Sequence, residues 1–533
     1  MLSRNRKQMS AVKCEDLSHQ DSENRVPGRP RHARIWAAGA VLAAVPLAAS
    51  GQTPAGSQAV TPTPPADTCS GYSVCPIVDF QDVITSDADT RRVNAFITAK
   101  EAQTLQKILA GNYSADGAKS ILGEVMIYDR NLSVNGLVAC ATCHTPQQAF
   151  TGGSSLLNQT TVAMVGAVGD RASGRKPMTY AYAPFAPVLS FRASTGDFVG
   201  GNFWDERATG FVTGNPAADQ ALGPPLNPVE MANPDAACVV YHLSQSQYRP
   251  LFEQVWGPQS FAITWPADTA DQCAQPGGAT TGPTSTVVDL SSSDRDQANT
   301  TFHEMGLSMA SYEASPAVSP FSSKFDAVIS GQGSFTTDEQ RGYDLFTGQA
   351  NCSQCHAVTG PKSMFTDFTA VNLGVPKNQE VPFYTENLPD SFGYTANPEG
   401  PTYQDTGLGA ILPTLGNPDW TALAPKFLGT FQVATTRNVN KRPRASFVKG
   451  YMHNGYFKSL EQVVHFYNTR DVLPACPTNV STEIGGAVGT KCWPAPEVPT
   501  NVNHTQTGNL GLSTDDELSI VAFLRTLTDG FSP

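Results

Sequence analysis

Two copies of one short pattern are the strongest chemical signal in this chain of 533 residues. They read Cys140-Ala141-Thr142-Cys143-His144 and Cys352-Ser353-Gln354-Cys355-His356. Cys-x-x-Cys-His is the attachment pattern of c-type haem, in which two thiols add to the porphyrin vinyl groups and the histidine supplies an axial nitrogen. On a helical turn, positions i, i+3 and i+4 share one face, so all three side chains reach one macrocycle. A zinc or redox Cys-x-x-Cys pair could explain one copy, but two copies predict two covalently bound haem c groups.

The sequence after the first pattern offers its iron no obvious second ligand. His144 is the candidate proximal ligand, and the next histidine is His242. The nearest methionines, Met164 and Met178, stand in loop-like sequence. An iron with one protein ligand keeps its sixth position open for a small molecule, as a catalytic haem requires. The alternative is a distant sixth ligand that folds back over the iron, such as Met231 or His303.

The second iron, with His356 as its candidate proximal ligand, has four candidates for a sixth ligand. They are Met452, His453, His465 and Tyr467. An i, i+3, i+4, i+7 spacing predicts a helix with one apolar face, formed by Leu460, Val463, Val464 and Tyr467. His465 would lie about 200° from Tyr467 around that helix, so both cannot face one haem. Tyr467 is the candidate on the inward face, and an ordinary core tyrosine is the alternative.

Two side chains between the haem patterns suit redox chemistry. Trp204 lies in Phe203-Trp204-Asp205-Glu206-Arg207, and Glu230 ends the run Asn227-Pro228-Val229-Glu230. An indole beside two haems can relay electrons or holes. A glutamate close to an open iron can move the proton of a bound peroxide between its two oxygens. The plain alternatives are a core aromatic and a capping carboxylate.

The first 50 residues have the features of an exported chain. A basic, polar segment precedes the apolar run 35–45, and the small residues Ala48-Ala49-Ser50 follow. The apolar run is too short and too rich in alanine for a confident membrane span, although a retained anchor is the alternative. We expect a cleaved signal peptide at 1–50, a periplasmic location and no membrane association afterwards.

Cysteine count and charge agree with export to an oxidising compartment. Outside the haem patterns and Cys14, six of the eleven cysteines remain. Their spacing suggests the pairs 69–75, 238–273 and 476–492, although six cysteines allow 15 connectivities. The net charge of −12 argues against a nucleic-acid partner and permits a basic redox partner.

The elements that must position these residues are mostly helices. Thr336-Thr337-Asp338-Glu339 and Ser513-Thr514-Asp515-Asp516 have the pattern of capped helix starts. Frequent Pro and Gly predict long loops at 256–295, 376–425 and 473–511, and 322–334 is the expected domain boundary. The fold class is therefore mainly α, with two tandem c-type cytochrome domains, long loops and few strands. The expected divisions are 51–95 for a linker or N-terminal extension, 96–325 for the first haem domain and 326–533 for the second.

From about residue 96 to 530 the chain resembles the bacterial di-haem cytochrome c peroxidase family, specifically its MauG-like branch. The resemblance rests on both haem patterns, the Phe-Trp-Asp-x-Arg element, the Gln to Glu-Met element at 220–231 and the Tyr-Met-His-Asn-Gly element at 451–455. It implies that the N-terminal haem reacts with peroxide and the C-terminal haem transfers electrons. It also implies that Trp204 lies between the haems and that Gln220 and Glu230 line the peroxide pocket.

The departures from the ordinary family pattern are informative. Ordinary members carry a histidine shortly after the first haem pattern, which blocks that iron until the other haem is reduced. This chain has none there, so the resemblance implies an enzyme that needs no reductive activation. Ordinary members also have a methionine where Tyr467 stands, which implies Tyr467 as the second iron's ligand. About six extra residues precede Gln220, and the family pattern admits one Ca²⁺ between the domains.

The expected function is a periplasmic di-haem peroxidase that reduces hydrogen peroxide and stores two oxidising equivalents across both haems, in a bis-Fe(IV) state. Its electron donor would be a small redox protein or a protein substrate. One alternative is a MauG-related oxygenase of the rubber-cleaving type, in which the open haem binds dioxygen. Another is a non-enzymatic electron-transfer cytochrome, which needs two six-coordinate irons.

Overall fold

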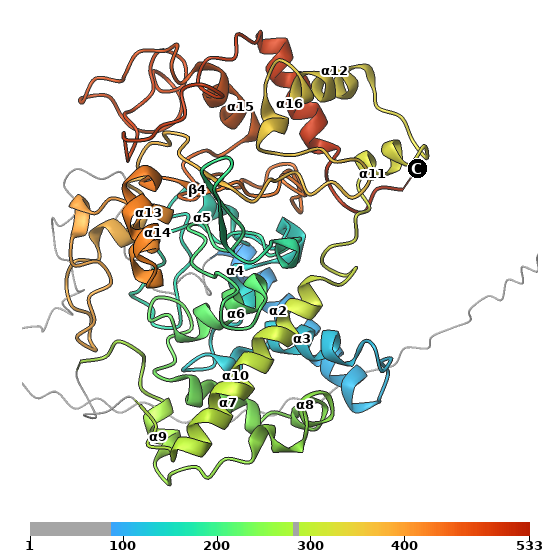
Figure 1. The fold of residues 1–533 in the computed structure, drawn as a ribbon, viewed down its shortest axis with the longest axis vertical. Helices are drawn as coiled ribbons and strands as arrows, with labels where there is room; N and C mark the ends of the chain where they lie inside the picture. The colour runs from blue at the N-terminus through green and yellow to red at the C-terminus, as the bar shows by residue number, and fades with distance from the viewer. Residues whose placement is uncertain (1–86, 281–286, 533) are drawn as a thin grey trace, which may run out of the picture. The chain divides into compact units, whose positions relative to one another are not determined.

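The computed structural model describes residues 87–280 and 287–532. The predicted signal peptide at 1–50 and the predicted Cys69–Cys75 pair lie outside the described residues. Within the described chain, long and short helices alternate with loops and strands are few, as the sequence predicted (Figure 1). The end of the predicted 51–95 extension is helical, because α2 begins at Ala88. No helix in the described part of the chain is both long and apolar enough to span a bilayer.

The helices differ widely in length. In the N-terminal part they are α2 (Ala88–Leu109), α3 (Ala118–Tyr128), α4 (Cys140–Cys143), α5 (Ser155–Gln159), α6 (Pro216–Leu226), α7 (Ala236–Ser244), α8 (Arg249–Trp256), α9 (Thr269–Cys273) and α10 (Ser292–Glu313). In the C-terminal part they are α11 (Lys324–Ile329), α12 (Thr337–Thr347), α13 (Leu408–Ile411), α14 (Pro418–Leu423), α15 (Leu460–Thr469) and α16 (Thr514–Arg525).

Helix α10 organises the first hydrophobic core by packing against α3, α6 and α7 (Figure 1). Gly123 allows α3 to approach α10 closely, because a Cβ at this position would collide with the backbone of Ser308. Leu122 and Met305 are fully buried in this core. Burial of each such side chain stabilises the fold by about 1.5–3 kcal/mol. The contact between α3 and α10 thereby helps to position the first haem pattern, because α4, which carries that pattern, packs against α3.

A similar crossing organises the second core. Helices α12 and α16 pack together, and a Cβ on Gly342 would collide with the backbone of Ser519. Phe346, Phe365 and Phe523 form a buried cluster of rings beside it, with centroids 5.1–6.4 Å apart. Such aromatic packing contributes about 0.5–1.5 kcal/mol per pair beyond area burial.

The predicted capped helix starts are confirmed. Thr336 and Glu339 form a reciprocal capping box at the start of α12, and Ser513 and Asp516 form another at α16. Each box satisfies backbone N–H groups that the first helical turn leaves without a partner. These local signals place the helices that carry the second core.

Four short strands in the described chain form two antiparallel pairs. β1 (Ser190–Arg192) pairs with β2 (Asp197–Val199), and β3 (Ala370–Val371) pairs with β4 (Phe431–Gln432). One antiparallel bridge between Val199 of β2 and Thr369, the residue before β3, links the two pairs. The strands therefore tie a segment that precedes Trp204 to the walls of the second haem site.

The segment 322–334, expected to be a domain boundary, contains helix α11. Ser323 and Asp326 form a capping box, and Phe325 is fully buried in the second core. The capping box and the buried ring together fit an ordered helix at the start of this polar segment. The sequence expectation missed this because the ring's partners lie far along the chain.

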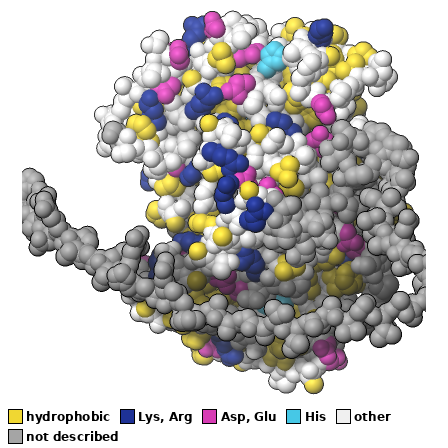
Figure 2. Space-filling model, turned by 180° about the vertical axis from the view of Figure 1, so that it is seen from behind, with side chains coloured by type: hydrophobic (Ala, Val, Ile, Leu, Met, Phe, Trp, Pro, Cys, Tyr) yellow, Lys and Arg dark blue, Asp and Glu magenta, His cyan; other side chains and the backbone are white. Residues whose placement is uncertain are grey.

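Two of the three predicted disulfides are confirmed, Cys238–Cys273 and Cys476–Cys492. Both tie down segments predicted to be long loops. Of those loops, 473–511 contains no helix, whereas 376–425 includes the short helices α13 and α14. Figure 2 shows Lys and Arg side chains gathered along the middle of one face, although the chain is net acidic.

Candidate functional site

The first haem pattern forms one wall of a cavity, here called the first cavity, lined by Cys140, Cys143 and His144. The two cysteines begin and end helix α4, and His144 follows as its C-cap. His144 Nδ1 lies 3.0 Å from the carbonyl oxygen of Phe150. That contact places the Nδ1 proton there and leaves Nε2 free to bind a metal. Burial lowers the pKa of His144 to about 4, so the imidazole is neutral, as a ligand must be.

The second haem pattern has the same arrangement. Cys352, Cys355 and His356 line another cavity, the second cavity. His356 Nδ1 lies 3.0 Å from the carbonyl oxygen of Phe365, so Nε2 is again the nitrogen that could bind a metal. Burial lowers the pKa of His356 as well.

All four haem-pattern cysteines are free thiols, whereas the other cysteines of the described chain form disulfides. Each pair of thiols and its adjacent histidine open into one cavity. Burial raises the pKa of the Cys140 and Cys352 thiols to about 12 in each case. These residues fit two covalently attached haem groups, with His144 and His356 as proximal ligands.

Trp204 lines both cavities. Its indole Nε1 donates a hydrogen bond of 2.9 Å to the backbone carbonyl of Lys176. Its own carbonyl accepts a 2.8 Å hydrogen bond from the Gln432 amide of β4. The indole and the backbone of Trp204 are therefore each held by a hydrogen bond in the wall that the two cavities share, and its position between two haems stays a prediction.

Gln220 and Glu230 both line the first cavity, and so does Pro224. Asn227 Nδ2 donates a hydrogen bond of 2.8 Å to the Glu230 carboxylate. Burial raises the pKa of Glu230, while the nearby Arg207 guanidinium and the Asn227 amide oppose that rise. A carboxyl with a raised pKa beside a substrate cavity suits general acid–base chemistry.

The first cavity contains several potential sixth ligands, of which none is a second histidine. Among the described residues that line it, His144 is the one histidine, and His303 lies elsewhere. Three methionines also line this cavity, namely Met164, Met178 and Met231. The open sixth position of the first iron therefore stays a prediction. The alternative is that one of these methionines occupies that position.

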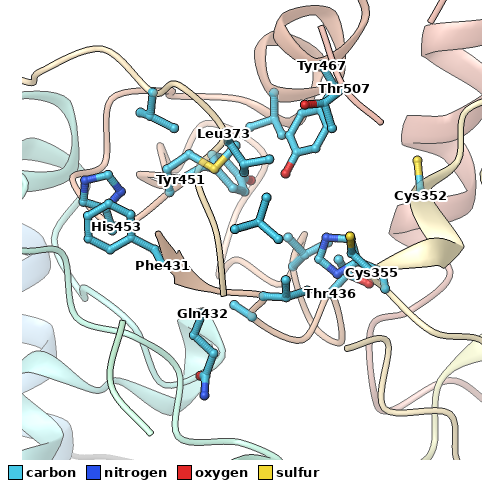
Figure 3. Close-up of a pocket in the computed structure, with 18 of the residues that line it drawn as sticks. Cys352, Cys355, Leu373, Phe431, Gln432, Thr436, Tyr451, His453, Tyr467 and Thr507 are labelled. Carbon is cyan, nitrogen blue, oxygen red and sulfur yellow. The ribbon is translucent and has the colours of Figure 1, made fainter. Parts of the chain in front are cut away.

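Tyr467 projects into the second cavity from α15. The predicted helix face is confirmed, since the cavity is lined by Leu460, Val463, Val464 and Tyr467. Figure 3 shows the Tyr467 hydroxyl pointing into the cavity, on the side that faces Cys355. No residue of the described chain hydrogen-bonds to this hydroxyl. A phenol oxygen without a protein partner in a cavity that holds His356 fits an axial iron ligand.

Helix geometry removes one competitor. His465 lies outside the second cavity, and its Nδ1 is 3.0 Å from Glu517 of α16. Met452 and His453 do line the cavity. The His453 ring, however, stacks on Phe431 at a centroid distance of 3.6 Å and an angle of 8°. Figure 3 places that stacked pair on the side of the cavity away from Cys355.

Several charged residues that the sequence did not single out build the wall between the cavities. Arg175 bridges Asp205 and Asp405, with N–O distances of 2.5 and 2.6 Å. Lys176 lines both cavities and Lys449 lines the second. Arg175 and Asp405 are 230 positions apart, so no local spacing signals the pair. Within the described residues, no group of three or more His, Cys, Asp or Glu could hold a metal ion. The calcium suggested by the resemblance stays a prediction.

Comparisons with known proteins agree with this site. A family model described as di-haem cytochrome c peroxidase matches residues 117–334. The methylamine utilization protein MauG of Paracoccus denitrificans is 32% identical over 426 residues, which cover 78% of this chain and 89% of MauG. The cytochrome-c peroxidase IdrP2 of Denitromonas iodatirespirans is 25% identical over 433 residues, covering 80% and 85%. The crystal structure of the diheme peroxidase BthA from Burkholderia thailandensis aligns with a TM-score of 0.56 and 25% identity, covering 77% of this chain and 86% of that one.

Proposed function

This chain belongs to the di-haem cytochrome c peroxidase family that includes MauG, and on that premise we propose that it is a periplasmic peroxidase that reduces hydrogen peroxide. The family consists of di-haem enzymes, and the relatives compared are named cytochrome c peroxidase or MauG. The observation that carries the proposal is the shared wall: two cavities, each with one Cys-x-x-Cys-His set, meet at Trp204.

The proposal assigns a separate role to each cavity. A haem held by Cys140, Cys143 and His144 would supply the iron chemistry of peroxide reduction in the first cavity. Glu230, held by Asn227, takes a proton from one peroxide oxygen and returns it to the other, which helps the O–O bond to break. Gln220 on the same wall offers an amide that can orient the substrate.

In the second cavity, His356 and Tyr467 are the proposed axial ligands. A phenolate is a hard anionic donor, so it stabilises oxidised iron and lowers the reduction potential. The second haem is therefore suited to hold one of the two oxidising equivalents, while Trp204 carries charge between the cavities. The donor that restores the resting enzyme is a small redox protein or a protein substrate.

Location and domain organisation complete the proposal. The signal-peptide features of 1–50 support export, and the two confirmed disulfides suit an oxidising compartment. The two glycine-mediated helix crossings, one in each core, support two tandem haem domains.

A second candidate function is electron transfer without peroxide chemistry. The methionines in the first cavity favour it, because a thioether on the first iron would give two six-coordinate haems. The ferric electron paramagnetic resonance (EPR) spectrum separates the two functions. A high-spin signal supports the peroxidase, and two low-spin signals alone support the electron-transfer protein.

Stopped-flow mixing tests the peroxidase directly. The all-ferric, two-haem protein is mixed with hydrogen peroxide in the absence of any reductant. An immediate change in the haem spectrum is expected, because no histidine besides His144 lines the described first cavity. A spectrum that changes only after one electron is added would contradict the open first iron.

A further inference from the structure

Two buried lysines in the wall between the cavities have no carboxylate partner. Lys176 is 8% exposed and Lys449 is 4% exposed. Fully buried lysines are rare unless they are paired, because removal of an ammonium from water costs several kcal/mol. In the described chain, neither ammonium forms an ion pair with Asp or Glu. The structure therefore leaves open which anion balances the charge of these two ammonium groups.

Backbone carbonyls hold both ammonium groups only in part. Lys449 Nζ donates to the carbonyl oxygens of Gln148 and Lys441, at 3.2 and 3.0 Å. Lys176 Nζ donates to the carbonyl of Pro177 at 3.2 Å. An ammonium carries three N–H donors, so each lysine keeps at least one free donor.

The charged groups that affect the Lys449 ammonium most are other cations. They are Lys176, Arg442 and Lys441, and together with burial they lower the pKa of Lys449 well below its usual value. Burial alone lowers the pKa of Lys176 to about 8. Two buried lysines in one wall thus lack an ion pair with any described carboxylate, which is unfavourable for their charged forms.

Both lysines border the space that the haems would occupy. Lys449 lines the second cavity, and Lys176 lines the first and the second. Each haem carries two propionate carboxylates, and a carboxylate is the anion that pairs best with a buried ammonium. The wall that holds Trp204 therefore presents positive charge to groups that carry matching negative charge.

We propose that Lys176 and Lys449 form a carboxylate-binding subsite for haem propionates, with Lys449 serving the second haem and Lys176 lying between both. The proposal rests on haem attachment at the two Cys-x-x-Cys-His sets. A lysine that pairs with a propionate removes negative charge from around the iron. This pairing favours the ferrous form and raises the reduction potential. Lys449 would then counteract part of the effect of the Tyr467 phenolate.

Spectroelectrochemical titration of the two-haem protein tests the subsite. Lys449→Met should lower the potential of the second haem, shifting its ferric–ferrous equilibrium at least tenfold, which is 59 mV for one electron. Lys176→Met should lower both potentials. Lys449→Arg, which keeps the charge, should restore the wild-type value.

Lys458 supplies a matched control. Its Nζ also donates to two backbone carbonyls, of Asn158 and Gly455, but it lines neither cavity and lies 4.0 Å from Glu380. Lys458→Met should leave both potentials unchanged. Equal shifts in Lys458→Met and Lys449→Met, or no shift in either of the two cavity variants, would overturn the subsite.

Two further measurements keep the test decisive if a variant accumulates poorly. The pyridine haemochrome assay counts covalent haems, so a failure of haem attachment is distinguished from a failure of the subsite. A crystal structure of the wild-type two-haem protein needs no variant. Propionate oxygens within hydrogen-bond distance of Lys449 Nζ or Lys176 Nζ support the proposal. Propionates directed elsewhere, with water or chloride at both lysines, refute it.

Discussion

The indole of Trp204 contacts Lys176 twice, through the Lys176 backbone carbonyl and through its side-chain ammonium. Trp204 Nε1 donates to the Lys176 carbonyl at 2.9 Å, and the Lys176 ammonium lies 5.7 Å from the centre of the indole ring. The backbone of one residue orients the ring, and its side chain places a positive charge over it. A cation at that position opposes oxidation of the indole unless a negative group neutralises it.

Trp204→Phe should leave both haems attached and slow charge sharing between them. The phenyl ring keeps the packing but removes the indole proposed to carry charge. It also leaves the buried Lys176 carbonyl without its donor, at a cost of about 1–3 kcal/mol. Rapid-mixing spectra after one equivalent of peroxide measure the sharing. Trp256→Phe is the control. This variant also loses an indole hydrogen bond of 2.9 Å, here to Ser308, but Trp256 lines neither cavity. Equal slowing in both variants would remove Trp204 from the path.

Tyr467→His should convert the second haem to an ordinary bis-histidine spectrum and raise its reduction potential, because an anionic phenolate is replaced by a neutral imidazole. Mössbauer spectra after one equivalent of peroxide should show two different Fe(IV) sites in the wild-type protein and lose this pattern in the variant. Tyr451→Phe is the control, since Tyr451 lines the same cavity and its buried hydroxyl also has no partner. A ferric spectrum of Tyr467→His identical to wild type would shift attention to Met452 or His453.

Glu230→Gln should slow formation of the peroxide-oxidised enzyme by about 10²–10⁴-fold, because glutamine cannot accept the peroxide proton. As a base, Glu230 acts in its deprotonated form. Burial raises its pKa, so the wild-type rate should fall as the pH decreases through a value above the ordinary glutamate range. The variant should lack this acid limb. Glu313→Gln changes another buried carboxyl in the first cavity and should react at the wild-type rate, whereas an equal loss would indicate a general effect of cavity polarity.

Arg437→Met should destabilise the protein by about 3–5 kcal/mol, because it leaves the partly buried Asp326 carboxylate without its cation. Arg437 is 2% exposed, and it donates to Asp326 at 2.7 and 2.9 Å and to the Ser363 carbonyl at 2.6 Å. Denaturant unfolding of the two-haem protein measures the loss. The exposed Arg341–Asp516 pair is the control, and Arg341→Met should cost less than about 1 kcal/mol.

The Arg437–Asp326 ion pair also predicts how the stability of the protein depends on pH in acid. Burial raises the pKa of Asp326, but the hydrogen bonds from Arg437 and Ser323 outweigh it and hold the pKa below the usual value. A lowered folded pKa means that the contribution is complete above the unfolded pKa of about 3.9 and disappears as the pH falls through the folded value. Stability of Arg437→Met should therefore depend less on pH below about 4 than that of wild type.

Local spacing predicted the parts of the site that lie within a few residues of each other. Both haem patterns open into cavities, and the apolar face of 460–467 lines the second one, because helical periodicity depends only on neighbouring residues. The capping boxes at Thr336 and Ser513 were predictable for the same reason. The assignments of Trp204, Gln220 and Glu230 came from the family resemblance.

The wall between the cavities could not be predicted from spacing. Lys176 and Lys449 come together from segments far apart in the chain, and each looks like an ordinary surface lysine in the sequence. Helix α11 was missed because the burial of Phe325 depends on α12 and α16, which follow it. Charge placement and burial of this kind are properties of the tertiary fold and leave no periodic trace.

Contacts on two opposite faces fix the orientation of helix α15 about its own axis. Tyr467 projects into the second cavity, and on the opposite side His465 contacts Glu517 at 3.0 Å. The orientation of α15 thus directs the side chain at position 467 into the second cavity. A change of one codon at position 467 can exchange oxygen for sulfur or nitrogen while the scaffold stays the same. If Tyr467 binds the second iron as proposed, the electrochemical character of that haem would be adjustable at one position without a change of fold.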